Sequence, residues 1–249
     1  MDAPVAVVLA AGQGTRMKSD LPKVLFEVCG KSMVEWVLDA LDKAGVAKAI
    51  VVVGYKSELV RERLADRENV EFAEQTERLG TGHAVQMCRE NLADHDGPVL
   101  VLTGDSPLIQ TTSIRSLLDD FNANQPACLL GTLNHENPAG LGRIVRDAAG
   151  DFLRIVEDKD ATDEQKQICE VNMSTYLFNN KDLLESLDQL TDENKQREYY
   201  LTDCPGILKS AGRDVRALPV LQQCESLSVN TVDELALVEE QMRQLGYQS

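Results

Sequence analysis

Residues 5–25 read VAVVLAAGQGTRMKSDLPKVL, and this stretch decides the fold. Its valine-rich start at residues 5–9 predicts a strand that is buried on both faces, as in a parallel sheet. Small residues and two glycines follow at residues 10–16, where a backbone can approach a ligand closely and point successive N–H groups at an anion. Arg16 and Lys23 add positive charge on either side. The stretch therefore predicts a loop that binds a nucleoside triphosphate after the first strand.

Two better-known glycine-rich loops do not match this chain. A dinucleotide-binding fingerprint requires a glycine where the chain has Met17. Gly30-Lys31-Ser32 resembles the end of a P-loop, but Leu25 stands where that motif requires its first glycine. We interpret Gly30-Lys31 as a turn before a helix that Ser32 caps.

The composition restricts the class of partner. The chain has 249 residues, of which 43% are hydrophobic, so it can bury a sizeable core. Its net charge is −16, from 25 basic and 41 acidic residues, which argues against binding of nucleic acid. A solvated surface is the simpler explanation of this acidity. An anionic substrate then depends on local positive charge, for which Arg16, Lys23 and Lys159 are the candidates.

The cysteines and the hydropathy indicate a cytoplasmic protein. The six cysteines are widely spaced, with no CxxC pair and no zinc-type spacing, and we interpret them as free thiols in a reducing compartment. The first residues do not resemble a signal peptide, and no apolar run reaches eighteen residues. We therefore expect no membrane partner.

The order of elements predicts the fold class. Strands and helices alternate in the first half, which predicts βαβ units and a parallel sheet. Strands are expected near residues 49–53, 70–73, 98–103 and 127–133, and helices near 33–44, 57–65, 81–92 and 112–122. In the second half we expect strands near 143–146, 152–156, 171–178 and 215–220, and helices near 183–190, 199–211 and 232–245. Residues 160–168 are polar, and their pattern also indicates a helix.

Polar residues gather where the expected strands end. In open α/β sheets, ligands bind outside the carboxyl ends of the strands. The 10–16 loop, Gln75, the Gly80-Thr81 turn and Gly104-Asp105 should therefore converge on one site, where Thr81 could also cap the next helix. A carboxylate such as Asp105 suits Mg²⁺, although an aspartate at this place can equally cap a turn. Gln75 could hydrogen-bond a pyrimidine edge or lie on the surface.

The string at residues 9–25 resembles the signature of the sugar nucleotidyltransferases. The nearest resemblance is to the uridyltransferase half of the bacterial N-acetylglucosamine-1-phosphate uridyltransferases, and it covers nearly all of the chain. The further segments that resemble this half, in the same order, are Gln75 with LGTGHA at 79–84, GD at 104–105, GLGR at 140–143, VEDKDA at 156–161 and EYYLTD at 198–203.

This resemblance implies a Rossmann-like α/β fold with a mostly parallel sheet flanked by helices and a smaller sugar-side lobe. We expect a single nucleotidyltransferase domain over residues 1–249, with a nucleotide-binding half at about 1–133, a sugar-binding lobe at about 134–230 and a C-terminal helix at 231–249. The acetyltransferase domain of bifunctional relatives consists of hexapeptide repeats, and this sequence has none. We therefore expect a monomer or a weak homo-oligomer.

The resemblance also implies the roles of residues at the nucleotide side. Arg16 is expected to bind the leaving β- and γ-phosphates, and Lys23 to neutralise charge at the α-phosphate. Asp105 and Asn230 are expected to hold Mg²⁺, although Asn230 could instead cap a turn. The residues expected to bind UTP are Leu9, Ala10, Ala11, Gly12, Gly14, Thr15, Gln75, Gly80 and Thr81, with the uracil recognised by Gln75 and the Gly80-Thr81 turn.

The sugar side departs from the family pattern in two places. The residues implied there are Gly104, Gly142, Glu157, Asn172, Tyr199 and Thr202. The family usually has Asn-Thr-Gly where this chain has Asn172-Met173-Ser174, and Glu-Gly-Val where it has Leu227-Ser228-Val229. Both departures are expected near the sugar, so they leave the identity of the sugar open. The three histidines receive no chemical role.

The expected reaction is Mg²⁺-dependent attack of N-acetylglucosamine-1-phosphate on the α-phosphate of UTP, which expels pyrophosphate. The nucleophile is a phosphate monoester with a second pKa of about 6, so it needs no general base at neutral pH. One alternative is a uridylyltransferase for another hexose-1-phosphate. A cytidylyltransferase fits the motifs less well, and a non-catalytic nucleotide sensor would be expected to lack Arg16, Lys23, Asp105 or Asn230.

Overall fold

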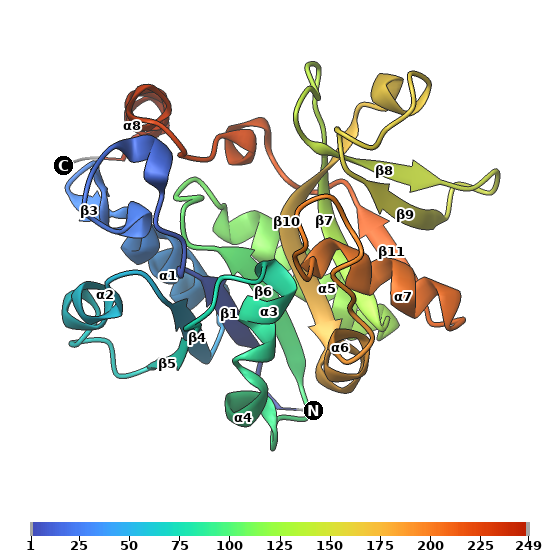
Figure 1. Ribbon diagram of the computed structural model, residues 1–249, viewed down its shortest axis with the longest axis horizontal. Coiled ribbons are helices and arrows are strands. Elements are labelled where there is room, and N and C mark those ends of the chain that lie inside the picture. The colour runs from blue at the N-terminus through green and yellow to red at the C-terminus, as the bar shows by residue number, and fades with distance from the viewer. Residues whose placement is uncertain (1, 248–249) are drawn as a thin grey trace.

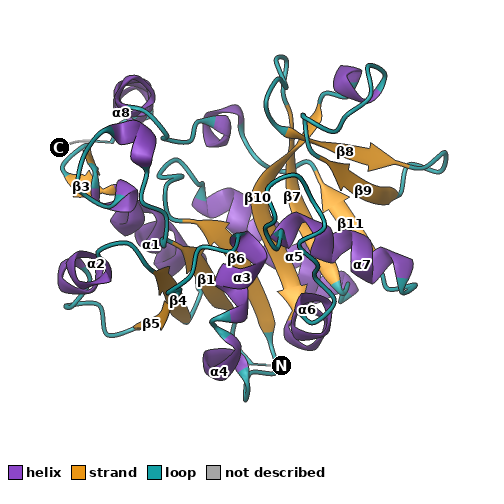
Figure 2. Ribbon diagram, in the orientation of Figure 1, coloured by secondary structure: helices purple, strands orange, loops and turns teal. Residues whose placement is uncertain are grey.

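The structure is a computed structural model that describes residues 2–247 (Figures 1 and 2). One nine-stranded sheet runs through it, with the order β11, β7, β10, β6, β1, β4 and β5; β8 pairs with β10, and β9 pairs with β8. These strands are β1 Val5–Leu9, β4 Lys48–Val53, β5 Val70–Glu74, β6 Pro98–Thr103, β7 Cys128–Asn134, β8 Gly142–Arg146, β9 Phe152–Val156, β10 Glu170–Asn179 and β11 Val215–Leu218. A small hairpin pairs β2 (Glu27–Val28) with β3 (Lys31–Ser32).

The first strand lies in the middle of the sheet, as the sequence predicts. β1 is parallel to β4 on one side and to β6 on the other. Its side chains alternate between the two faces. Val5 and Val7 belong to one core cluster, whereas Ala6 and Val8 belong to another. This strand therefore contributes to the packing on both faces of the sheet.

Helices cover both faces of the sheet (Figure 2). The core cluster that contains Ala6 and Val8 also contains buried residues of three helices, α1 (Met33–Ala44), α2 (Ser57–Arg63) and α5 (Thr111–Asn124). The cluster of Val5 and Val7 includes residues of the helices α3 Thr81–Gln86, α4 Arg89–Leu92, α6 Asn180–Leu187 and α7 Cys204–Ser210. The predicted α/β fold with a mostly parallel sheet is confirmed. In the part of the chain that the structure describes, no helix is long and apolar enough to cross a membrane.

The second half of the chain does not form a separate sheet. β10 lies between β6 and β7 and is antiparallel to both, so the long strand after residue 170 returns into the main sheet. Only β8 and β9 extend away from it, as an antiparallel pair (Figure 1). Both halves of the chain therefore contribute strands to one sheet.

Some expected helices differ from those observed. The helix expected over residues 81–92 is two short helices, because Cys88 has non-helical angles of φ −84° and ψ 0°. Residues 160–168 contain only the 3₁₀ turn η3 (Gln165–Gln167). The helix expected from residue 199 begins only at Cys204, and the Tyr199 N–H instead donates to the Leu79 carbonyl at 2.7 Å. The remaining 3₁₀ turns are η1 Thr15–Met17, η2 Lys23–Leu25, η4 Leu201–Asp203 and η5 Gln223–Ser226.

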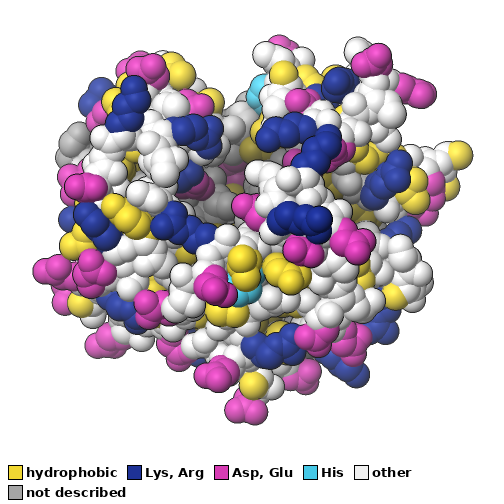
Figure 3. All heavy atoms as spheres, in the orientation of Figure 1, with side chains coloured by type: hydrophobic (Ala, Val, Ile, Leu, Met, Phe, Trp, Pro, Cys, Tyr) yellow, Lys and Arg dark blue, Asp and Glu magenta, His cyan; other side chains and the backbone are white. Residues whose placement is uncertain are grey.

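The C-terminal helix α8 (Val232–Gln244) begins with a well-formed cap. The Thr231 hydroxyl accepts from the Glu234 N–H at 3.2 Å, and the Glu234 carboxylate accepts from the Thr231 N–H at 2.9 Å. Such a reciprocal pair satisfies N–H groups that the first turn of a helix leaves unbonded. In Figure 3 the acidic and basic side chains are scattered over the face in view, with a hollow between α8 and the β8 side.

Candidate active site

The loop after β1 folds back towards Lys23. The Ala10 N–H donates to the Val52 carbonyl at 2.9 Å, which continues the pairing of β1 with β4. Gly14 has φ +67°, and a Cβ there would lie 2.6 Å from the Cβ of Lys23. Only glycine fits this position, because it has no side chain and tolerates the left-handed conformation. The turn η1 that follows presents Arg16 to solvent and buries Met17.

Four predicted residues from distant parts of the sequence meet beside this loop. The Asn230 side-chain oxygen accepts from Arg16 Nη2 at 2.8 Å and from Lys23 Nζ at 3.0 Å. Lys23 Nζ also forms an ion pair with Asp105. These residues come from the loop after β1, the end of β6 and the segment before α8. The predicted catalytic and metal-binding residues therefore form one cluster at the carboxyl ends of the central strands.

Asn230 is fixed by its neighbours. Its N–H donates to the Glu234 carboxylate at 2.7 Å, and the Val229 N–H donates to the carbonyl of Asp105 at 3.3 Å. Glu234 therefore caps α8 and holds the backbone of Asn230 at the same time. Sequence reasoning missed Glu234, although a threonine followed three residues later by a glutamate is the signal of a capping box.

Gln75 is buried rather than on the surface, with 6% of its area exposed. Its Nε2 donates to the Gly80 carbonyl at 3.1 Å and lies 3.1 Å from His83 Nδ1. A carbonyl oxygen only accepts, so this contact fixes which end of the amide is the nitrogen. His83, which received no role from the sequence, supports Gln75. A contact of this kind leaves no signal in a single sequence.

The Gly80-Thr81 turn packs against the segment before η4. A Cβ on Gly80, which has φ +110°, would lie 2.5 Å from the Tyr199 carbonyl oxygen. The prediction that Thr81 caps a helix is wrong, because the cap position of α3 is Gly80 and the Thr81 hydroxyl accepts from the Leu201 N–H at 3.0 Å. Close packing against residues 199–201 therefore explains why the turn has glycine at position 80 and threonine at position 81.

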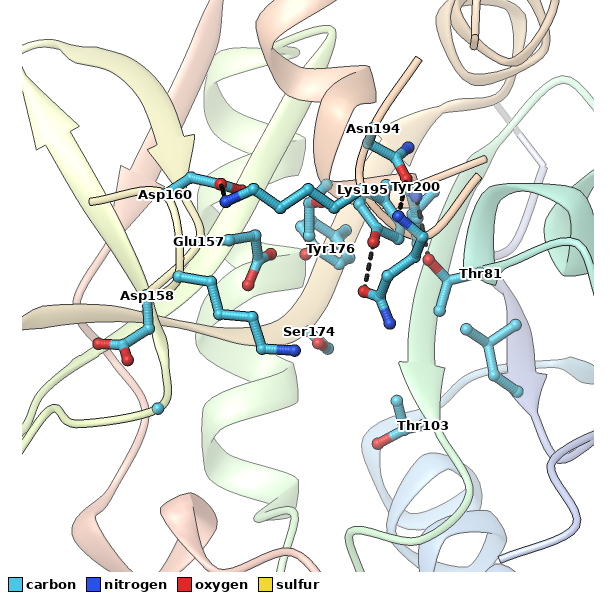
Figure 4. Close-up of a pocket in the computed structure, with 16 residues that line it drawn as sticks. Thr81, Thr103, Glu157, Asp158, Asp160, Ser174, Tyr176, Asn194, Lys195 and Tyr200 are labelled. Carbon is cyan, nitrogen blue, oxygen red and sulfur yellow. Dashed lines mark hydrogen bonds and ion pairs between the residues drawn. The ribbon is translucent and has the colours of Figure 1, made fainter. Parts of the chain in front are cut away.

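A cavity of about 450 Å³ opens where β1 and β6 end (Figure 4). The last residues of these strands, Leu9 and Thr103, form part of its wall. The predicted site residues that line it are Leu9, Thr81, Glu157 and Thr202, and Lys159, Ser174, Tyr176 and Lys195 line it as well. This volume is in the range of small-molecule sites. Residues predicted to bind the nucleotide and residues predicted to bind the sugar therefore line one cavity at the ends of the central strands.

The other residues predicted for the sugar support the wall of the cavity instead of lining it. Asn172 pairs with Gly142 across β10 and β8, and its Nδ2 donates to the buried Tyr176 hydroxyl at 2.7 Å. Tyr199 contributes backbone contacts to the Gly80 turn. Gly104 donates its N–H to the Leu9 carbonyl at 2.9 Å, and a Cβ there would lie 3.2 Å from that oxygen.

The electrostatics of the cavity centre on Glu157. Burial raises the pKa of its carboxyl group, and Asp203 and Asp160 raise it further, whereas a hydrogen bond with Thr202 and the charge of Lys159 oppose this. Burial also raises the pKa of Glu225, but that carboxylate accepts three hydrogen bonds from the protein, from Ser113 and from the N–H groups of Gln110 and Gln222. A half-buried carboxylate with few donors from the protein, such as that of Glu157, suits a ligand that carries hydroxyl groups.

Lys195 closes one side of the cavity. Its Nζ lies 2.8 Å from the Asp160 carboxylate, so the loop before η4 is tied to the loop after β9 (Figure 4). Asn194 supports the same loop by donating to the Glu198 carbonyl. Tyr176 and this loop were missed by sequence reasoning because their role depends on contacts across the fold.

Comparison with known proteins shows the family of the chain. The family description "MobA-like NTP transferase domain" matches residues 6–203. The chain belongs to this family of nucleotidyltransferases. Nucleotidyltransferases of this family generally use a divalent metal ion.

Several curated proteins are similar along nearly the whole chain. The sequence is 45% identical over 238 residues to the bifunctional protein GlmU of Clostridioides difficile and 47% identical to that of Streptococcus suis. Each match covers 96% of this chain and 51% of the relative, so the chain spans about half the length of these proteins. These matches confirm the resemblance to the uridyltransferase half that the sequence motifs indicate.

The fold is also that of a solved nucleotide-sugar enzyme. The crystal structure of a UDP-glucose pyrophosphorylase complexed with UDP-glucose superposes with a TM-score of 0.78, covering 98% of this chain and 100% of the other. The two sequences are 15% identical, so this likeness concerns the fold alone.

Proposed function

We propose that this chain transfers UMP from UTP to N-acetylglucosamine-1-phosphate, giving UDP-N-acetylglucosamine and pyrophosphate. The observation that carries the proposal is the cluster of Arg16, Lys23, Asp105 and Asn230 beside a 450 Å³ cavity at the ends of β1 and β6. The 45–47% identity to proteins named as bifunctional GlmU supports it.

Gln75 would recognise the uracil through its amide oxygen. Its nitrogen is engaged by Gly80 and His83, and within residues 2–247 its oxygen has no hydrogen-bond partner. An acceptor oxygen pairs with the N3–H of uracil, whereas N3 of cytosine is itself an acceptor and would leave both atoms unpaired. A buried, unpaired polar atom is costly, so this contact favours UTP over CTP.

Arg16 and Lys23 would act on the triphosphate. Phosphoryl and nucleotidyl transfer depend mainly on positioning and on stabilising the charge that develops on phosphate oxygens. The exposed Arg16 would hold the β- and γ-phosphates that leave. Lys23, at the centre of the cluster, would neutralise the α-phosphate. The remaining predicted nucleotide contacts are the backbone groups of Ala10, Ala11, Gly12, Gly14 and Thr15.

Asp105 and Asn230 would hold the metal, for which we propose Mg²⁺. Both offer oxygen atoms, and both contact the same ammonium nitrogen of Lys23, so they flank a position where a cation is stable. Within the described residues no cluster of three or more His, Cys, Asp or Glu side chains could hold a metal. Magnesium characteristically binds one or two carboxylates together with phosphate oxygens and water. When bound, it would supply positive charge to the phosphate oxygens.

The sugar would occupy the cavity. Glu157 would accept from sugar hydroxyl groups, supported by Thr202, while Asn172 and Gly142 hold the wall behind it. The phosphate of the sugar is the nucleophile and is mostly dianionic at neutral pH, so no side chain has to remove a proton.

We further propose that the chain acts in the cytoplasm, because its six cysteines are all free, as in a reducing compartment. That it forms a monomer or a weak homo-oligomer, and that residues 1–249 act as one domain, remain predictions.

The test is release of pyrophosphate with Mg²⁺ and UTP over a panel of sugar-1-phosphates. The panel holds the 1-phosphates of N-acetylglucosamine, glucosamine, glucose and N-acetylgalactosamine, with CTP in place of UTP as the control. Release that depends on UTP and N-acetylglucosamine-1-phosphate is the expected result. A clear preference for another sugar would overturn the assigned acceptor. Binding of UTP with no release from any pair would indicate a nucleotide sensor instead.

A further inference from the structure

Ser174 has a backbone conformation that its residue type does not explain. It lies inside β10 at φ +53°, in the left-handed region that favours glycine. The pairing of β10 with β7 shifts between Asn172 and Thr175, so Met173 and Ser174 form a bulge. A left-handed position in such a bulge is typically occupied by glycine. Strained residues of this kind concentrate at functional sites, where the surrounding structure maintains them.

The other non-glycine residues with positive φ have local explanations. Lys18 and Gln125 are the C-terminal caps of η1 and α5, where a left-handed residue is common. Lys56 lies in the turn before α2, and Arg197 ends a turn in which its N–H donates to the Asn194 carbonyl at 3.2 Å. Cys29 lies in the turn between β2 and β3. Among the described residues with positive φ other than glycine, Ser174 alone lines the 450 Å³ cavity.

The surroundings hold Ser174 in this conformation. Its N–H donates to the Asn172 side-chain oxygen at 3.2 Å, and the Asn172 nitrogen donates to the Tyr176 hydroxyl at 2.7 Å. The pKa of the buried Tyr176 is raised by its burial, which hydrogen bonds with Asn172 and Ser174 oppose. In the view of Figure 4, Ser174 lies along the cavity wall between Glu157 and Thr103.

Two other residues at which the chain departs from the family pattern pack into apolar clusters. Met173 packs with Leu141 and Val220 against the apolar cluster of Leu133, Val171 and Leu221. Leu227 packs with the cluster that contains Val229 and Val238. Neither lines the cavity in the described part of the chain. Among the residues at which the chain departs from the family pattern, Ser174, which follows Met173 in the bulge, is the one that lines the cavity.

We propose that Ser174 is a sugar-specificity residue, whose hydroxyl group contacts a polar substituent of the sugar ring in the cavity. This inference rests on the proposed function, because it takes the occupant of the cavity to be the sugar of a uridine nucleotide. A glycine would remove the strain and leave no hydroxyl group. Ser174 therefore combines an unfavourable backbone conformation with a hydroxyl group on the wall of the cavity.

The test compares binding of UDP-N-acetylglucosamine with binding of UDP by calorimetry. UDP lacks the sugar, so the ratio of the two affinities isolates the sugar contacts. Ser174→Ala removes the hydroxyl group and keeps the Cβ, and we expect it to lower this ratio by about 10-fold. Ser174→Gly should lower the ratio to the same extent and also raise the melting temperature, because it relieves the left-handed strain. Met173→Leu is the matched control and should leave the ratio unchanged.

The outcomes separate the two proposals. An unchanged ratio in Ser174→Ala would overturn the specificity role, and so would equal weakening of UDP and UDP-N-acetylglucosamine. A change in Ser174→Gly alone would show that the backbone matters and not the hydroxyl group, which also contradicts the proposal. A wild-type chain that binds UDP-N-acetylglucosamine but releases no pyrophosphate would overturn the proposed reaction, while the Ser174 comparison would still be decided by binding. Wild-type protein that binds no sugar nucleotide would overturn both.

Discussion

The two sides of the site differ in how far their polar groups are already paired. At the nucleotide side, Lys23 contacts both Asp105 and Asn230, and Arg16 shares the same Asn230 oxygen. At the sugar side, a 450 Å³ space faces a carboxyl group of raised pKa on Glu157. A ligand would therefore replace existing contacts on one side and fill a space on the other.

This difference predicts different consequences of mutation. On the nucleotide side, Lys23 and a cation would compete for the Asp105 carboxylate, so an incoming triphosphate would have to draw Lys23 away. On the sugar side, the wall is held by backbone pairing between β8, β9 and β10, and substitutions there should alter selectivity more than rate. The predictions below run from the first kind of effect to the second.

The largest effect is expected from Lys23→Ala. Removing a charge that stabilises the α-phosphate should lower the rate of pyrophosphate release by about 10³-fold while UTP still binds. The rate should be measured at saturating UTP, with UTP binding measured separately. Lys31→Ala is the matched control, because Lys31 is also paired with an aspartate, Asp39, outside the site. A normal rate in Lys23→Ala would remove Lys23 from the chemistry.

The next effect is expected from Asp105→Asn. Loss of one carboxylate should reduce the rate by about 10²-fold and raise the Mg²⁺ concentration needed for half-maximal activity, since even indirect supports of a metal contribute 10- to 100-fold. A magnesium titration of pyrophosphate release measures both quantities. Asp39→Asn is the control, because its side chain is as exposed as that of Asp105 and is paired with Lys31. An unchanged magnesium dependence would show that Asp105 only orients Lys23.

A smaller effect is expected from Gln75→Ala. Without the amide oxygen, the preference for UTP over CTP should fall by about 10-fold, as for other single buried hydrogen bonds. The measurement is kcat/KM for each nucleotide at fixed N-acetylglucosamine-1-phosphate. Gln86→Ala serves as the control, because Gln86 donates to the Leu187 carbonyl away from the cavity. An equal decrease in kcat/KM with UTP and with CTP would show that Gln75 supports the Gly80 turn and does not distinguish the two bases.

The fold was predictable where the decisive contacts are local or repeat along the chain. The apolar run at residues 5–9 is buried at the centre of the sheet, and α1 begins after Ser32 and ends before Gly45 as expected. The position of β10 was not predictable, because its antiparallel pairing with β6 joins residues far apart in the sequence. Periodicity identifies a strand but does not say which neighbours it pairs with.

The site likewise contains residues that were predictable from the sequence and residues that were not. The resemblance to the family implied related roles for Arg16, Lys23, Asp105 and Asn230, and the structure brings these four side chains together. Which of Met173 and Ser174 faces the cavity depends on a bulge, since a shift of one residue exchanges the faces of a strand. Pattern alone did not reveal this bulge, because Ser174 is not the glycine that would have signalled it.

The smallest expected effect concerns the sugar side and depends on pH. Burial, with Asp203 and Asp160, raises the pKa of Glu157 in the folded protein. Above the unfolded pKa of about 4.3, the unfolded chain has released a proton that the folded chain still holds, so stability falls as pH rises through the folded pKa. Glu157→Gln cannot ionise and escapes this loss. Its melting temperature should therefore exceed that of the wild type by about 2–4 °C at pH 8, and the excess should shrink towards pH 4.

Melting curves of both proteins from pH 4 to pH 8 measure this difference. The exposed Glu193→Gln removes the same charge and should show no such trend. A difference between Glu157→Gln and the wild type that stays constant with pH would mean that Glu157 titrates alike in the folded and unfolded chains. The contrast between the two sides would then rest on the open space of the cavity and not on its charge. A trend that shrinks when UDP-N-acetylglucosamine is bound would show that the sugar supplies the donors this carboxylate lacks.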